Sequence, residues 1–165
     1  MVCIGYQGIG KSTLCNNQSI SFKFIDLESS SFFNDEGVRP DDWYIYYCNV
    51  AEHLSSQRCI VFVSSHEVVR NRLKNSKENI CIICPSPKLK DKWTERLEKR
   101  YKLTKKDKDY KAWQNALDRY TENINELKNS GFPVIEIQDM NYDLKQMVIN
   151  YEIEILAHRI SEDYK

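Results

Sequence analysis

One short segment near the start of the chain constrains its fold more than any other feature. Gly5 to Ser12 fit the pattern G-x-x-x-x-G-K-[ST] completely, and Thr13 adds a second hydroxyl. Glycines let backbone N–H groups surround phosphates, the lysine reaches the β- and γ-phosphates, and the serine hydroxyl binds Mg²⁺. An apolar segment precedes the loop and a helical pattern follows, so the start of that helix also points its positive end at the anion. The segment predicts an ATP·Mg²⁺ site with these contacts: Gly5, Gln7, Gly8, Ile9, Gly10, Lys11, Ser12 and Thr13.

Strand-like and helical patterns alternate along the chain. The expected strands are short apolar segments at 2–4, 22–27, 59–63, 80–84 and 134–137. The expected helices cover 11–17, 41–57, 66–74, 89–103, 110–128 and 142–160. This alternation predicts a three-layer α/β fold, in which a five-stranded parallel sheet lies between helices. Ligands of such sheets bind beyond the carboxyl ends of the strands.

Bulk properties narrow the classes of partner. The length of 165 residues predicts a single domain, 1–165. Lys plus Arg and Asp plus Glu both number 24, so no net positive field attracts a nucleic acid polymer or an anionic membrane. No apolar run is long enough to span a bilayer and no leader pattern is present, so we expect a cytoplasmic protein. The six cysteines are expected to be reduced core thiols.

Two other classes of nucleotide-binding protein fit the sequence poorly. Thr104 to Asp107 match the base-reading T-K-x-D of GTPases, but they follow an amphipathic helix, and the chain contains no D-x-x-G switch. Helicase and transporter ATPases place an acidic metal ligand at the end of an apolar strand. The third strand here continues Ser64-Ser65-His66, without a carboxylate.

The order of elements and the phosphate loop resemble the small kinase branch of P-loop proteins. That branch includes nucleoside monophosphate kinases and shikimate- and gluconate-kinase-like enzymes, and the chain looks most similar to short phage-type nucleotide kinases. The resemblance implies a parallel sheet of order 2-3-1-4-5. It also implies an acceptor-binding segment at about 28–57 and a mobile, arginine-bearing lid at about 88–108.

The resemblance assigns roles to residues that follow the second strand. Asp26 and Glu28 resemble the D-x-D of shikimate-kinase-like enzymes, with glutamate in place of the second acid. Asp26 would hold a water on Mg²⁺ or orient the acceptor hydroxyl, while Glu28 and Ser29 would contact the acceptor. The alternative is that these acids only cap a loop or helix.

In the lid, Arg96 and Arg100 are four residues apart and share one helical face, so both can reach the transferring phosphoryl group. A solvated charged face is the competing interpretation. Further candidates are the acceptor contacts Tyr44, Ser64, Ser65 and Arg70, and the adenine contacts Asp139 and Asn141. Arg70 fits a surface position equally well, and His66 is expected to begin a helix rather than to act as a base.

The sequence departs from nucleoside monophosphate kinases at one place. These enzymes commonly carry Asp-Gly-aromatic-Pro-Arg after the third strand, where this chain has Ser64-Ser65-His66. Three hypotheses follow: a kinase of a (deoxy)nucleoside monophosphate, a kinase of a non-nucleotide hydroxyl acceptor, or a nucleotide-binding regulatory module with little turnover. The first is preferred. We also allow for a homodimer.

Overall fold

The computed structural model describes residues 1–16, 23–34, 36 and 38–163. Five strands form one parallel sheet in the order β2-β3-β1-β4-β5, which confirms the predicted fold class. The strands are β1 (Val2–Gly5), β2 (Lys23–Asp26), β3 (Cys59–Val63), β4 (Ile80–Pro85) and β5 (Val134–Ile137). The expected first residue of the second strand, Phe22, lies outside the described residues.

Strand β1 lies at the centre of the sheet. It pairs with β3 on one side and β4 on the other, and all its side chains are buried. Both neighbours are buried along their whole lengths as well. Continuous apolar runs are what a strand needs when helices cover both of its faces. The loop that leaves β1 therefore starts from the buried centre of the sheet.

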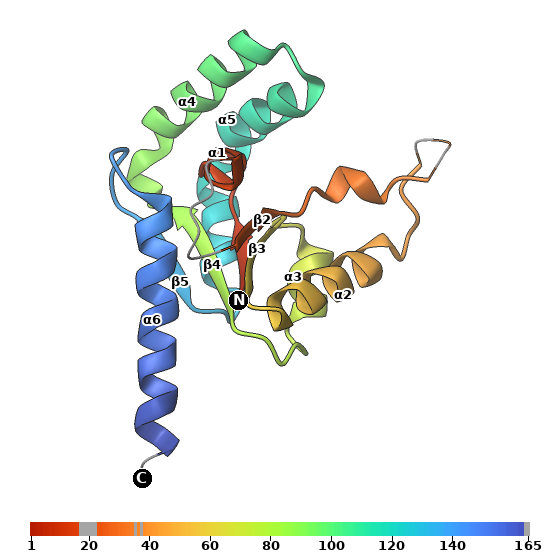
Figure 1. Ribbon diagram of the computed structural model, residues 1–165. Helices are drawn as coiled ribbons and strands as arrows, with labels where there is room; N and C mark the ends of the chain where they lie inside the picture. The colour runs from red at the N-terminus through yellow and green to blue at the C-terminus, as the bar shows by residue number, and fades with distance from the viewer. Residues whose placement is uncertain (17–22, 35, 37, 164–165) are drawn as a thin grey trace.

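Helices cover both faces of this sheet (Figure 1). One face carries α2 (Trp43–Ser56), α3 (Glu67–Leu73) and α5 (Asp107–Lys128), and the other carries α1 (Lys11–Asn16) and α6 (Leu144–Asp163). An ion pair between Arg70 and Glu126 links α3 to α5. The contact between α1 and α6 places the last helix beside the first. The three-layer arrangement is thus present.

An antiparallel helical pair, α4 (Lys90–Thr104) and α5, stands at the carboxyl end of the sheet (Figure 1). The helices predicted at 89–103 and 110–128 leave a charged hinge between them, but in the structure only Lys105 and Lys106 separate the two helices. Lys105 adopts a left-handed conformation, with φ of 54°, and makes the turn. Asp107 and Asp109 then occupy the first turn of α5, where negative charge favours a helix start. The hinge prediction was wrong because acids at a helix start look like a charged linker.

Smaller differences concern element ends. The second helix was expected to begin at residue 41, but α2 begins at Trp43, after a turn in which the Trp43 N–H donates to the Pro40 carbonyl at 3.1 Å. Two short 3₁₀ helices, η1 (Ser29–Phe32) and η2 (Pro87–Leu89), were not predicted. The expected end of the first helix, Asn17, lies outside the described residues.

All six cysteines are unpaired, and five of them are buried, which confirms the prediction of core thiols. Within the described residues, no helix combines the length and apolarity that crossing a bilayer requires.

Candidate functional site

The Gly5–Ser12 loop takes a shape that its glycines make possible. Gly8 and Gly10 have φ of 82° and 95°, a region that costs other residues about 1–2 kcal/mol. A Cβ atom on Gly5 would lie 2.8 Å from Ile9 Cδ1 and 2.9 Å from Lys11 Cδ, so the loop closes tightly on itself. The compact turn is the backbone geometry that a phosphate cradle needs.

Lys11 points back across the loop. Its Nζ donates to the Gly5 carbonyl at 3.3 Å. Burial lowers the pKa of this ammonium group, and the neighbouring Asp26 and Glu28 carboxylates partly oppose that effect, whereas Arg100 adds to it. A partly desolvated cation held by a weak backbone contact is available for a stronger anionic partner.

Ser12 and Asp26 meet at the start of α1 and the end of β2. The Ser12 Oγ donates to Asp26 Oδ2 at 2.6 Å, so the two oxygens predicted to share a metal lie side by side. No cluster of three or more His, Cys, Asp or Glu side chains suited to a metal occurs in the described part of the chain. Mg²⁺ in phosphate sites needs only one or two protein oxygens, because phosphates and waters complete its shell. The hydroxyl–carboxylate pair therefore fits Mg²⁺.

Helix α4 is docked directly on the phosphate loop. Trp93 donates its indole N–H to the Gln7 carbonyl at 3.0 Å. Leu97 is fully buried, and a Cβ atom on Gly8 would lie 2.9 Å from its Cδ2. The Gln7 side chain donates to the Ala112 carbonyl of α5 at 2.8 Å, so Gln7 can contact nucleotide only through its backbone. The loop is thus held between α1 and the α4–α5 pair.

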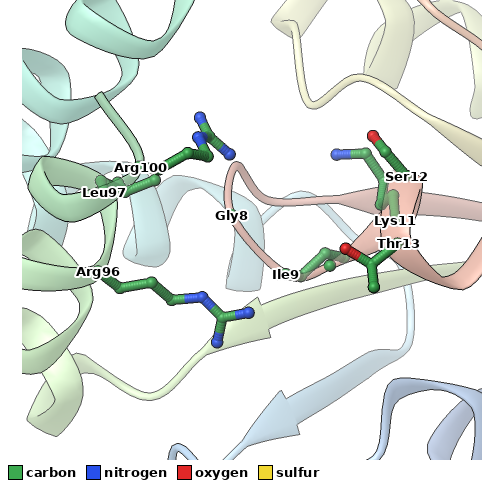
Figure 2. A pocket seen from close by; sticks show the side chains of 9 residues that line it. Gly8, Ile9, Lys11, Ser12, Thr13, Arg96, Leu97 and Arg100 are labelled. Carbon is green, nitrogen blue, oxygen red and sulfur yellow. The ribbon is translucent and has the colours of Figure 1, made fainter. Parts of the chain in front are cut away.

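Figure 2 shows Arg96 and Arg100 extending from α4 toward the loop from one side, with Lys11, Ser12 and Thr13 on the other. The Arg96 guanidinium lies 5.2 Å from the centre of the Trp93 ring. The Arg100 Nε lies 3.0 Å from Oδ1 of Asp109, a buried carboxylate that also accepts from the Thr104 hydroxyl. The two arginines line one hollow with the loop rather than a solvated face, and we call it the phosphate hollow.

A second hollow continues from the first on the α6 side of the loop. Both hollows are lined by Ile9, Gly10, Thr13 and Arg96. Tyr142 adds an aromatic wall here: its ring stacks with Trp93 at 6.1 Å, and its hydroxyl donates to the Ile9 carbonyl at 2.9 Å. We call this hollow the Tyr142 hollow.

The predicted adenine contacts, Asp139 and Asn141, lie outside the Tyr142 hollow. Both are exposed, and the Asn141 N–H donates to Asp139 Oδ1 at 2.7 Å in a local turn. The hollow is lined instead by neighbours of theirs, Met140, Tyr142, Asp143 and Lys145.

A third hollow, of about 480 Å³, opens on the other side of Lys11 and Ser12. We call it the Asp26 cleft. It contains the predicted acceptor residues Glu28, Ser29 and Ser64 together with Asp26 and Arg100. Two lysines and one aspartate near the α4–α5 turn also line it: Lys106, Lys108 and Asp109.

Other predicted acceptor residues lie elsewhere. Tyr44 is partly buried against the core and lines none of the hollows described for this face. Its neighbour Tyr47 reaches the strand ends instead, where its hydroxyl donates to the Leu27 carbonyl at 2.7 Å and accepts from the Ser64 N–H at 2.8 Å. Burial raises the pKa of Tyr47, so the phenol keeps its proton and can make both bonds.

Ser65 and Arg70 line a fourth hollow, of about 370 Å³, between α3 and α5. The sequence fits a surface position for Arg70 as well as a site position, but the residue is buried and donates to the Ser65 carbonyl. His66 precedes α3, as predicted, and its pKa is lowered by burial and then by Arg39 and Arg70. We call this fourth hollow the α5 cavity.

Sequence reasoning missed three residues that shape the site, Trp93, Tyr142 and Asp109, and it missed the bond from the Gln7 side chain to α5. Trp93 and Tyr142 were assigned only to helical patterns. A usable signal existed for Trp93, because it lies three residues before Arg96 and so on the same face of α4. No local pattern marks Asp109 as the partner of Arg100, since the pair forms across a turn.

A solved structure resembles this chain in fold. The crystal structure of shikimate kinase from Bacteroides thetaiotaomicron superposes with a TM-score of 0.51 and 14% sequence identity, over 97% of each chain. The chain has a P-loop kinase fold. The sequence matches no protein-family profile. It also matches no curated protein sequence.

Proposed function

We propose that this protein transfers the γ-phosphoryl group of ATP to a small acceptor bound in the Asp26 cleft. One observation carries the proposal: Gly8, Lys11, Ser12 and Arg100 line both the phosphate hollow and the Asp26 cleft. A phosphoryl group leaving ATP in the first hollow therefore meets an acceptor in the second. The structural neighbour is named as a shikimate kinase, which agrees with this reaction class.

The protein's part in the reaction is positioning and charge neutralisation. An acceptor oxygen attacks the γ-phosphorus, the bond from that phosphorus to the β,γ-bridging oxygen breaks, and ADP leaves. Lys11 and the loop N–H groups hold the phosphates, while Arg96 and Arg100 face the charge that spreads over the moving group. Mg²⁺, held by Ser12 and through water by Asp26, would supply further neutralisation of the phosphate charge. The docked α4 excludes water that would otherwise hydrolyse ATP.

Our first choice of acceptor is a (deoxy)nucleoside monophosphate. Its attacking atom is a phosphate oxygen that carries no proton at neutral pH, so no base is required. Lys106 and Lys108 at the rim of the Asp26 cleft supply positive charge for that phosphate.

A non-nucleotide hydroxyl acceptor is the second candidate, because Asp26 and Glu28 both line the cleft. The attacking hydroxyl must lose its proton, and Asp26 is the group placed to accept it.

ADP release, measured with a panel of monophosphates and small hydroxy compounds, distinguishes these acceptors. Acceptor-dependent release that requires Lys11 supports a kinase. Tight ATP binding without release for any acceptor overturns the proposal in favour of a regulatory nucleotide-binding module.

A further inference from the structure

The α5 cavity joins the other three hollows in one row. The Tyr142 hollow and the phosphate hollow share Arg96, the phosphate hollow and the Asp26 cleft share Lys11 and Arg100, and the Asp26 cleft shares Gln7 with the α5 cavity. The α5 cavity therefore lies on the acceptor side, at the far end from the Tyr142 hollow. The Asp26 cleft and the α5 cavity thus adjoin at Gln7, whose side chain bonds to the Ala112 carbonyl.

One face of α5 forms the wall of the cavity. Asn115, Arg119, Asn123 and Glu126 recur at spacings of four, four and three, which places them on a single helical face. Arg119 itself leaves helical geometry, with φ of −131° and ψ of 20°, so the helix changes direction within this wall. The opposite wall comes from the start of α3 and the end of β1, through Ser65, His66, Arg70 and Tyr6.

Two residues that line the cavity each hold a buried polar atom with no hydrogen-bond partner among the described residues: Tyr6 Oη and Asn123 Nδ2. The side chains of Gln7 and Asn123 approach the Tyr6 hydroxyl closely enough to oppose the rise in its pKa that burial causes, but no bond of normal geometry forms. Tyr6 is only 2% exposed. A buried polar atom without a partner is costly, and a ligand with matching polar groups removes that cost.

The charges of the cavity are already balanced. Arg119 Nη2 lies 3.2 Å from Glu126 Oε1, and its Nε lies 2.9 Å from Glu122 Oε2. Arg70 Nη2 lies 3.8 Å from Glu126 Oε2, and its Nη1 bonds to the Ser65 carbonyl. Both guanidinium groups of the cavity are thus paired with acids. The other polar groups that line it are the Glu67 carboxylate, the His66 ring, and the amides and hydroxyls of Asn115, Asn123, Ser65 and Tyr6.

We propose that the α5 cavity binds the base of an acceptor nucleotide, read by Asn115, Asn123 and Tyr6. A side-chain amide offers one donor and one acceptor, which can pair with the edge of a base in a two-bond contact. The volume of about 370 Å³ falls within the range of about 300–1,000 Å³ typical of small-ligand pockets. This inference rests on the proposed kinase function and selects the nucleotide among its two acceptors.

The test is binding of the four common nucleoside 5′-monophosphates, with ribose 5-phosphate as the base-free probe, to the full chain without ATP. At least one nucleotide should bind about tenfold or more tightly than ribose 5-phosphate. Asn115→Ala combined with Asn123→Ala should weaken the binding of that nucleotide by about tenfold or more and leave the binding of ribose 5-phosphate unchanged. The matched control is Asn125→Ala, because Asn125 lies on the same helix, is exposed and does not line the cavity.

The inference is overturned if nucleotides bind no better than ribose 5-phosphate, or if the double variant binds nucleotide normally. A thermal melt of the double variant is run in parallel to verify that it folds. Asn123→Asp keeps the shape of the side chain and one acceptor, and it should change which base is preferred. ADP release with a small hydroxy acid and none with nucleotides would remove this inference while leaving the kinase function intact. Selective nucleotide binding with no phosphoryl transfer to any acceptor would overturn the kinase function while leaving this inference intact.

Discussion

Trp93 of α4 donates its indole N–H to the backbone carbonyl of Gln7 in the phosphate loop, with 3.0 Å between the two atoms. The bond joins the segment that carries Arg96 and Arg100 to the loop that carries Lys11. Leu97 packs on Gly8 one helical turn further along α4. The position of both arginines relative to the phosphate loop is therefore set by contacts within the protein.

We expect Trp93→Phe to loosen this docking while keeping an aromatic ring against Tyr142. Loss of one neutral hydrogen bond costs about 0.5–1.5 kcal/mol. Hydrogen exchange in residues 89–108 should accelerate in the variant, and a bound bisubstrate analogue should restore protection in both proteins. Equal exchange in the two proteins, with and without the analogue, would show that α4 is a fixed surface rather than a lid.

Gly8→Ala should both destabilise the protein and weaken ATP binding. The positive φ alone costs about 1–2 kcal/mol, and the new Cβ would lie 2.9 Å from Leu97 Cδ2. Gly131→Ala is the matched control, because Gly131 also has positive φ, 90°, but has nothing within 4 Å of an added Cβ. Thermal melts of both variants should show the larger loss for Gly8→Ala. Equal losses would mean that α4 does not press on the loop.

Arg96→Ala and Arg100→Ala should each lower kcat with little change in ATP affinity, since their charge acts mainly in the transition state. The double variant should lose less than the product of the two single losses if both contact the same phosphoryl group. Lys99→Ala is the control: its side chain is 69% exposed and pairs with Glu95 on the outer face of α4. Steady-state kinetics of these four variants is the test. A normal kcat in both single arginine variants would refute the transition-state roles of Arg96 and Arg100.

The fold was largely predictable from the sequence, and the site only in part. Short apolar strands alternating with helices are local patterns, so the sheet and its helices could be read from periodicity. The phosphate loop has a fixed spacing and was found for the same reason. The docking of Trp93 on Gln7 and the pair of Arg100 with Asp109 join segments through tertiary packing, which no local spacing encodes.

Asp26→Asn should reduce activity by far more than its unchanged size suggests. The amide keeps a hydrogen bond with Ser12 within reach but removes the negative charge that holds Mg²⁺-bound water or accepts a proton. ATP affinity should barely change, because the loop is untouched. Asp41→Asn, on an exposed turn, is the control. Turnover above about half of normal in Asp26→Asn would show that Asp26 only caps the local structure.

Nucleotide binding should be coupled to proton uptake at alkaline pH. Burial lowers the pKa of Lys11 in the free protein, and bound phosphates favour its charged form and raise that pKa again. Between the two pKa values the free amine is neutral and the bound amine is charged, so ATP affinity should fall as pH rises through this window. Calorimetry in buffers of different ionisation enthalpy measures the uptake directly. Lys11→Met should abolish it, and uptake that persists in Lys11→Met would assign the proton to another group.

The central claim is phosphoryl transfer from ATP through Lys11 to a separate acceptor. Its most direct test is ADP release by the wild-type and Lys11→Ala proteins across the acceptor panel, with circular dichroism to verify the fold. The account predicts release that depends on an acceptor and falls by roughly 10²-fold or more in Lys11→Ala, since the phosphates lose their main counter-charge. Near-normal release by a folded Lys11→Ala protein would contradict it.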